Sequence, residues 1–171
     1  MACPQTITGL AKDCDANIGG IKEVYIANFD DVTGKTVTTD VISAIEMASS
    51  AKFKKFAFPR NTGVMTSTYT VDQAASVKFV TTTLALQFNH LSTAKRLEMN
   101  ALALADLAVI VLDSNGKYWY LGYDDPVTMS AGDQTTGTAR TDANRYAITL
   151  EDVSRNYPYE VSAEAIASII D

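Results

Sequence analysis

The spacing of hydrophobic and polar residues changes along residues 92–122, and this change predicts one helix followed by one hairpin. Residues 92–104 are rich in helix-forming residues. Apolar residues recur there at helical spacing and predict one apolar face, made of Ala94, Leu97, Ala101, Leu104 and Ala108. Residues 108–112 form an apolar run with several β-branched residues, and residues 117–122 form a second run. Asn115 and Gly116 lie between these runs, and because both tolerate positive φ, they predict a β-hairpin turn.

Most of the remaining pattern favours strands. Strand-like stretches cover residues 21–29, 36–47 (two short strands or one bent one), 53–58, 64–69, 77–88, 127–129 and 145–153. Residues 130–144 contain no apolar residue larger than alanine, which predicts a flexible loop or a marginal hairpin arm. Ser162 is expected to begin a short C-terminal helix. The apolar residues around it need burial; they are Val161, Ile166, Ile169 and Ile170.

The domain organisation follows from the length of the chain and from the position of its irregular segments. At 171 residues the chain is expected to form one domain with a real core. Residues 1–20 show little periodicity and predict an extended N-terminal arm, which leaves 21–171 as a single β-rich domain that contains the polar loop 130–144. The longest apolar run, residues 101–112, is interrupted by Asp106 and is shorter than the roughly 20 residues of a membrane span. No secretory signal is visible at the N-terminus, so the product is expected to stay where it is made.

The net charge and the distribution of basic residues argue against a protein that binds nucleic acid tightly. The net charge is −6, and the basic residues cluster only at Lys52, Lys54, Lys55 and Arg60. Binding of nucleic acid requires a basic face, whereas an acidic surface is compatible with standing beside DNA without holding it. The two cysteines, Cys3 and Cys14, match no zinc or redox pattern. Free thiols are favoured over a disulfide between them in a cytosolic setting.

Candidate catalytic residues do not combine into a site. The single histidine, His90, has no nucleophile pattern beside it and is interpreted as a structural or exposed turn residue. Residues 33–36 (Thr-Gly-Lys-Thr) resemble the end of a phosphate loop, but Phe29 stands where that loop needs a glycine. They are therefore interpreted as a turn with a lysine.

Three further patterns in the sequence resemble parts of metal, paired-acid or sugar-stacking sites. Residues 113–116 have the composition of a calcium loop, but Asp124 stands where such a loop needs glutamate, so a hairpin turn is preferred. Three acidic pairs are interpreted as turn caps or solvated edges; they are Asp30-Asp31, Asp124-Asp125 and Glu151-Asp152. Trp119 lies between Tyr118 and Tyr120, and period two puts the tyrosines on one face and the tryptophan on the other, so one of these faces is core. We therefore predict a protein that is not an enzyme, with no catalytic residue, cofactor site or metal site.

Several segments resemble a known family of structural proteins. Residues 117–123 and 137–152 are similar to a pattern near the C-terminus of the tail-tube family of bacteriophage virion proteins. Residues 6–14 and 19–28 resemble structural proteins of phages that infect gut Bacteroidetes, including crAss-like phages. The resemblance covers about residues 5–160.

The resemblance implies an α+β, mostly β fold: a two-sheet sandwich or barrel with one flanking helix, assembled as a homo-oligomeric ring. Its implied function is that of a virion structural protein, made in the bacterial cytoplasm, whose rings form the tail tube or a neck connector for DNA ejection. Its implied partners are itself, neighbouring tail or neck proteins, and DNA as a passing, non-specifically bound polymer, with no membrane. Residues 1–20 and 130–144 would then clasp subunits or stack rings. The alternative is a capsid-decorating or host-glycan-binding virion protein that uses Tyr118, Trp119 or Tyr123.

Overall fold

The computed structural model describes residues 6–171 and consists mostly of two β-sheets with few helices, which confirms the mostly β fold class. A seven-stranded sheet has the order β2-β3-β11-β8-β7-β1-β4, and a four-stranded sheet has the order β5-β6-β10-β9. The seven strands are β1 (Ile21–Asn28), β2 (Val32–Thr38), β3 (Val41–Met47), β4 (Lys54–Phe56), β7 (Leu107–Asp113), β8 (Tyr118–Leu121) and β11 (Tyr159–Val161). The four are β5 (Val64–Asp72), β6 (Val77–Asn89), β9 (Thr128–Thr135) and β10 (Arg145–Ser154).

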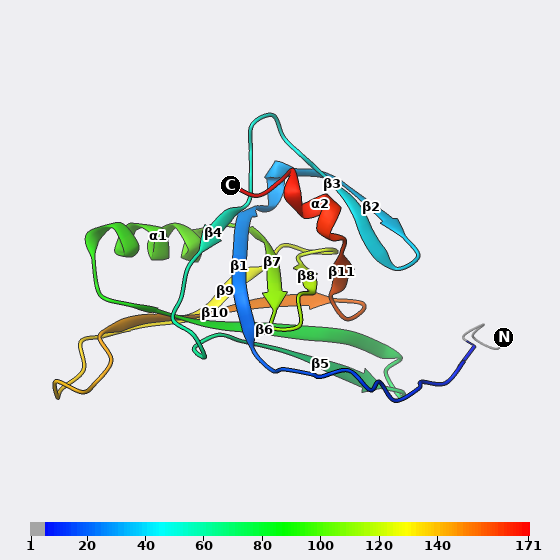
Figure 1. The fold of residues 1–171 in the computed structure, drawn as a ribbon, viewed down its shortest axis with the longest axis horizontal. Helices are drawn as coiled ribbons and strands as arrows, with labels where there is room; N and C mark the ends of the chain where they lie inside the picture. The colour runs from blue at the N-terminus through cyan, green and yellow to red at the C-terminus, as the bar shows by residue number, and fades with distance from the viewer. Residues whose placement is uncertain (1–5) are drawn as a thin grey trace.

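The main core lies between the two sheets, whose strands cross at a steep angle (Figure 1). In the four-stranded sheet one face is apolar because inward side chains recur at every second residue, whereas β7 of the seven-stranded sheet is buried on both faces. The four-stranded sheet contributes Leu84, Leu86, Phe88, Tyr146, Ile148 and Leu150, and the seven-stranded sheet contributes Val24, Ile26, Leu107, Val109, Val111 and Leu121. This arrangement leaves the opposite face of each sheet to be covered by something else.

A second core covers the far face of the seven-stranded sheet. Helix α2 (Ala163–Ala167) begins after Ser162, whose side chain accepts a hydrogen bond from the amide of Ala165, as the sequence predicts. The helix and the residues beside it pack over Tyr25, Ile110 and Tyr120; they include Val161, Ile166 and Ile169. The apolar C-terminal residues are therefore buried against their own domain.

Helix α1 (Thr93–Leu104) forms where the sequence predicts it, with the Ser92 side chain accepting from the Lys95 amide at 3.3 Å. The predicted apolar face is wrong, however. Met99 and Leu102 are the helix residues buried in the main core, while Leu97 and Leu104 remain 57% and 92% exposed. Ala108 lies beyond the helix, in β7. The helix therefore packs on the sheets with a different face from the one that the spacing of its apolar residues predicts.

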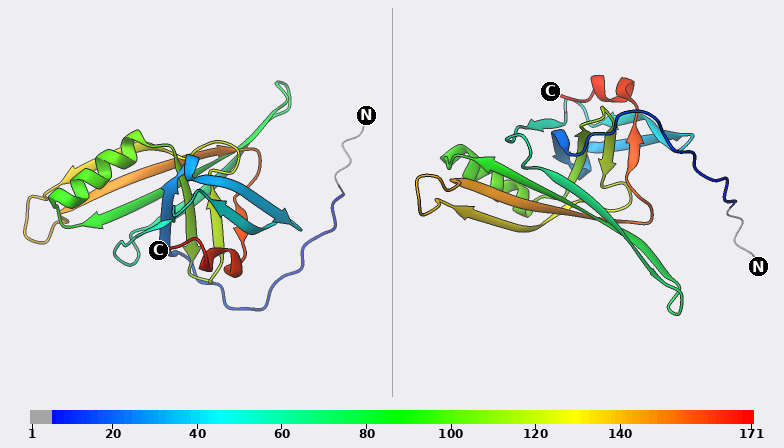
Figure 2. Two further views of the ribbon diagram at one scale, coloured as in Figure 1. Left: turned by 90° about the horizontal axis from the view of Figure 1, so that it is seen from above. Right: turned by 60° about the horizontal axis from the view of Figure 1, so that its bottom comes forward.

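The polar segment 130–144 is only partly a loop. Residues 130–135 belong to β9, which pairs with β10 from Thr128 to Thr135, so of the two predicted alternatives the hairpin arm is right for them and the flexible loop is wrong. Figure 2 shows that the remaining loop, 136–144, and the tip of the long β5–β6 hairpin project from opposite ends of the four-stranded sheet. Both projections are exposed.

Residues 6–20 form no helix or strand and run along the outside of the body before entering β1. The predicted Asn-Gly turn anchors them. Gly116 adopts a φ of +85° in the turn between β7 and β8, and Asn115 donates from Nδ2 to the Asn17 side chain and to the Ile18 carbonyl. Cys14 is exposed in this arm. The preference for free thiols over a Cys3–Cys14 disulfide also concerns Cys3, which lies outside the described residues.

Candidate assembly surface

The uncovered face of the four-stranded sheet is a candidate functional surface, and we call it the outer face. Its members alternate with the core residues, and the register places them side by side across the strands. They are Val64, Thr66, Thr68 and Thr70 of β5, Phe79, Thr81, Thr83, Ala85 and Gln87 of β6, Arg145, Ala147, Thr149, Glu151 and Val153 of β10, and Thr128, Ala131, Asp133 and Thr135 of β9. In contrast to the far face of the other sheet, no second apolar core covers this one within residues 6–171.

Threonine dominates the outer face, and charge is sparse on it. One positive and two negative side chains lie there, namely Arg145, Glu151 and Asp133. Arg145 donates from Nη1 to Oε1 of Gln87 at 2.6 Å, so its charge is tied to the sheet. No lysine belongs to the face as defined. A polyanion beside this surface would therefore contact mainly hydroxyl and apolar groups, and few positively charged side chains would be available to bind it.

The two edges of the four-stranded sheet are unpaired in the described chain. β5 and β9 are its outermost strands, and each pairs on one side only. β5 is nine residues long and contains no proline, no lysine and no charge before Asp72. An unprotected edge of this kind presents a row of free N–H and C=O groups that pairs readily with another strand.

The edges of the seven-stranded sheet are protected by contrast. β4 has three residues and carries Lys54 and Lys55, which pair with Asp171 and Glu23. β2 contains two register shifts along its pairing with β3. Short length, charge and irregular pairing are the usual protections against edge-to-edge association. The open edge of β5 therefore distinguishes the four-stranded sheet as the one suited to intermolecular pairing.

A second surface feature is an aromatic pocket of about 560 Å³ at one end of the sandwich. Its lining includes Tyr69, Trp119, Tyr157 and Tyr159, with Asp40 and Glu160 among the polar members. Tyr69 and Tyr157 meet edge to face with ring centroids 5.2 Å apart. The period-two prediction for residues 118–120 is confirmed, since Tyr120 is fully buried in the second core with Tyr118 packed against it, while Trp119 lies on the other face.

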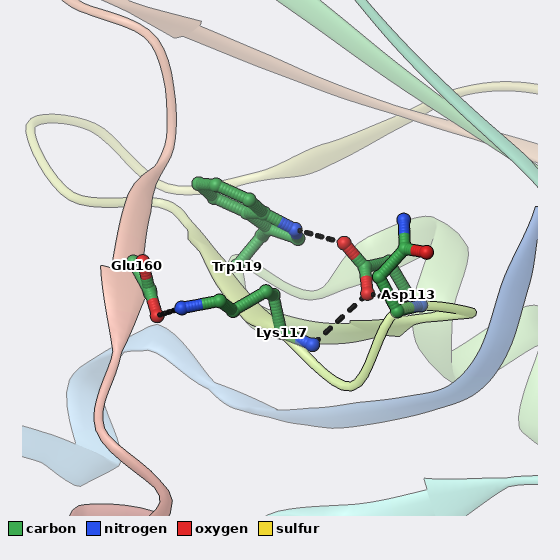
Figure 3. Close-up of polar contacts among 5 residues, drawn as sticks. Asp113, Lys117, Trp119 and Glu160 are labelled. Atoms are coloured by element: carbon green, nitrogen blue, oxygen red, sulfur yellow. Dashed lines mark hydrogen bonds and ion pairs between the residues drawn. The ribbon is translucent and has the colours of Figure 1, made fainter. Parts of the chain in front are cut away.

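Trp119 is held by Asp113, as Figure 3 shows. The Trp119 indole donates to Oδ2 of Asp113 at 3.0 Å, and the amides of Asn115 and Lys117 donate to Oδ1 at 2.8 and 2.9 Å. Burial acts to raise the pKa of Asp113, but these hydrogen bonds outweigh it and hold the pKa below its usual range. Lys117 extends to Glu160 of β11 with 2.5 Å between Nζ and Oε1, which ties the hairpin to its neighbour. Residues 113–116 are thus the predicted hairpin turn.

We expect Asp113→Ala to lower the free energy of unfolding by about 1–3 kcal/mol at pH 7, because three donors lose one acceptor. A carboxylate with a lowered pKa stabilises the fold above its unfolded pKa and loses that effect as the pH falls through its folded pKa. The difference between variant and parent should therefore shrink below about pH 4. Urea unfolding across pH tests this, with the exposed Asp30→Ala as control. Equal stability of the parent and Asp113→Ala at pH 7 would contradict the prediction.

A buried polar cluster lies where the two sheets meet. Asp152 of β10 is 1% exposed, and neither its Oδ1 nor the Tyr120 hydroxyl has a hydrogen-bond partner among the described residues. Lys35 donates to the Tyr123 carbonyl at 3.0 Å and lies over the Tyr120 and Tyr123 rings. Burial raises the pKa of Asp152 to about 6; Asp124 and Asp125 add to the increase, while the Gly122 amide and Lys35 oppose it. Burial lowers the pKa of Lys35.

The structure corrects two interpretations of sequence motifs at this cluster. Residues 33–36 are not a turn but part of strand β2, and they place Lys35 against aromatic rings. Asp152 is not a solvated edge residue, although its neighbour Glu151 does point to the opposite face as expected. His90 is an exposed turn residue with a φ of +64°, in line with its interpretation. These motif residues do not converge on one catalytic site.

The outer face was missed by sequence reasoning, although a signal for it exists. Threonines recur at 66, 68 and 70 and again at 81 and 83, which is the period-two pattern of one strand face. The alternation of large apolar residues identifies the core face of each strand, whereas the threonines between them do not stand out as a second face.

Among residues 6–171, no helix has the length and apolar character needed to cross a bilayer. The same residues contain no cluster of three or more histidine, cysteine or acidic side chains arranged to hold a metal ion. Comparison of the chain with protein-family models, with curated proteins and with solved structures found no match.

Proposed function

We propose that this chain is a self-assembling virion structural protein whose four-stranded sheets join into a ring around a DNA channel, as a tail tube or a neck connector. The observation that carries the proposal is the long unprotected edge of β5 beside an uncovered, threonine-rich sheet face. Resemblance of the sequence to tail-tube proteins supports the same function.

Strand directions are compatible with ring closure. Each neighbouring pair in the order β5-β6-β10-β9 is antiparallel, so β5 and β9 run in opposite directions. Rotation about an axis along the strands preserves strand direction, and β9 of one copy then meets β5 of the next as an antiparallel pair. A ring built in this way has a continuous antiparallel wall, and closure removes the free edges.

The chemistry of the outer face suits the inner wall of such a channel. Its hydroxyl and apolar groups and its three charged residues offer little to hold a polyanion. Net charge of −6 acts in the same direction. DNA would pass as a non-specifically contacted polymer, while the β5–β6 tip and the 136–144 loop would contact the rings above and below.

Negative-stain electron microscopy of the purified protein, together with its mass in solution, tests this function. We expect closed rings or stacked tubes with a central channel; stacked tubes favour a tail tube and single rings favour a neck connector. A protein that stays monomeric at high concentration and is absent from purified virions would contradict the proposal.

The aromatic pocket favours a second candidate function, a host-glycan-binding or capsid-decorating protein. Tyrosine and tryptophan rings that line one pocket with carboxylates are suited to stacking and hydrogen bonding of a sugar. For this function, Tyr157→Ala should reduce binding on a glycan array about tenfold or more while the circular dichroism spectrum is unchanged. Leu97→Ala, exposed on α1, serves as the control. Absence of glycan binding by the parent protein would remove this candidate.

A further inference from the structure

Two of the rings that line the aromatic pocket have polar groups that are already used within the chain. The Trp119 indole N–H donates to Asp113, as Figure 3 shows, and the Tyr69 hydroxyl donates to the Arg155 carbonyl at 3.2 Å. Trp119 and Tyr69 therefore offer a ligand their rings rather than a free hydrogen-bond donor. The face of an aromatic ring carries partial negative charge and attracts cations.

The charged side chains that line this pocket are negative. Asp40 and Glu160 belong to the lining, and within residues 6–171 no lysine, arginine or histidine does. Glu160 is paired with Lys117, whereas Asp40 has no ion-pair partner in the described part of the chain. A carboxylate beside aromatic rings favours a cationic ligand over an anionic or a neutral one.

Two further carboxylates lie behind one wall of the pocket. Residues 156–159 line both this pocket and a small cavity that is also lined by Asp124 and Asp152. Oδ1 of the buried Asp152 has no hydrogen-bond partner among the described residues, and the single charge of Lys35 offsets only part of the charge of these two carboxylates. They therefore make the potential in the pocket more negative.

Lysine side chains of the same chain already contact neighbouring rings in this way. Nζ of Lys35 lies 4.9 Å from the centroid of the Tyr123 ring, and Nζ of Lys78 lies 5.4 Å from that of Tyr69. Tyr69 lines the pocket, and Tyr123 packs against another lining residue, Tyr159, with ring centroids 4.5 Å apart. Lys78 is not part of the lining, so its charge lies at the margin of the pocket and opposes the binding of a second cation there.

We propose that the aromatic pocket binds an organic cation of the alkylammonium class, with the cationic group against the rings of Trp119 and Tyr157 and balanced by Asp40. The pocket volume of about 560 Å³ is in the range of small-molecule sites. A free alkylammonium compound and the lysine side chain of another protein present the same chemistry to this pocket. Such a site is independent of ring assembly, and its ligand carries a charge that a neutral sugar lacks.

Titration with choline, followed by the fluorescence of Trp119, tests the site directly, because Trp119 is the single tryptophan of the chain. We expect a saturable change in fluorescence, and at least about tenfold weaker binding of dimethylbutanol, the uncharged carbon isostere of choline. Sodium chloride at the same ionic strength controls for general salt effects. Titration with a short lysine peptide identifies the source of the ligand: tighter binding of the peptide indicates a protein side chain, and tighter binding of choline indicates a small molecule.

Two changes of charge should alter choline binding in opposite directions. Asp40→Asn should weaken it at least about threefold, whereas Asp30→Asn, which removes the same charge at an exposed position outside the pocket, should leave it nearly unchanged. Asp40 has a φ of +61°, a conformation that asparagine also adopts, so the fold is retained. Lys78→Gln should strengthen choline binding about twofold, because it removes the cation at the margin of the pocket.

A matched pair of variants at Tyr157 tests the role of the ring. Tyr157→Leu should weaken choline binding at least about threefold, whereas Tyr157→Phe, which keeps the aromatic face, should retain it. Tyr157 is 55% exposed, so circular dichroism spectra should be unchanged. Absence of a saturable response to choline and to the lysine peptide, equal binding of choline and dimethylbutanol, or a response to neutral sugars alone would overturn the cation site. None of these results bears on ring assembly, which electron microscopy decides separately.

Discussion

Thr68→Asp should give a folded protein that no longer assembles. Thr68 lies at the centre of the β5 edge with its side chain on the outer face, so the substitution places a charge on the edge that is proposed to pair with β9 of the next copy. Edge charges oppose strand addition, and β9 itself carries Asp133 on the same face. We expect association to weaken at least about tenfold, equivalent to about 1.4 kcal/mol at each contact.

Thr81→Asp is the matched control for this experiment. Thr81 lies directly opposite Thr68 in the register and on the same face, but on β6, which is paired on both sides within the subunit. It introduces the same charge without altering a free edge. Light scattering and negative-stain microscopy should show assemblies for Thr81→Asp and monomers for Thr68→Asp, with similar circular dichroism spectra. Equal assembly of the two variants would show that β5 is not the joining edge.

Asp152→Asn should raise the free energy of unfolding by up to about 3 kcal/mol at pH 8. The pKa of Asp152 is raised from 3.8 to about 6 in the folded protein, and each pKa unit corresponds to about 1.4 kcal/mol. Asparagine resembles the protonated acid, so it removes the cost of a buried carboxylate while it retains an acceptor for the Gly122 amide.

The raised pKa of Asp152 makes the stability of the parent protein depend on pH. An acid with a raised folded pKa binds its proton more tightly in the folded state, so the parent should become less stable as the pH rises from about 4 to 6 and then level off. Asp152→Asn should remove most of that slope. Urea unfolding at pH 5 and pH 8 measures it, and Asp30→Asn, at an exposed position that does not act on Asp152, serves as the control. A parent that is more stable at pH 8 than at pH 5, with Asp152→Asn destabilised at both, would contradict the prediction.

Local signals in the sequence predicted most of the strands because their inward residues are large and alternate. The 77–88 and 145–153 stretches pair with each other and form the centre of the four-stranded sheet, and their leucine and isoleucine positions are the buried ones. The Asn115-Gly116 turn was equally clear, since its chemistry is local. Capping by Ser92 and Ser162 was predictable for the same reason.

The remaining features depend on partners far along the chain. Helix α1 has two stripes of apolar residues, and alanine at positions 94 and 101 does not distinguish buried from exposed, so only the packing of the helix decides that Met99 and Leu102 face the core. β9 consists of small and polar residues and is a strand because β10 pairs with it. The burial of Lys35 and Asp152 similarly depends on the meeting of β2, β8 and β10, which no short window of sequence contains.

The position of β11 has a consequence for when, during synthesis, the protein could begin the proposed assembly. β11 lies between β3 and β8 and is the strand that connects the β2–β3 hairpin to the rest of the seven-stranded sheet. During synthesis, the β2–β3 hairpin emerges early but has to wait for residues 159–161 before it can join that sheet. The edge of β5 is likewise made before its own domain is complete. Premature pairing between nascent chains is therefore a kinetic hazard for this topology, and rapid closure by β11 and α2 would favour monomers that associate only after folding.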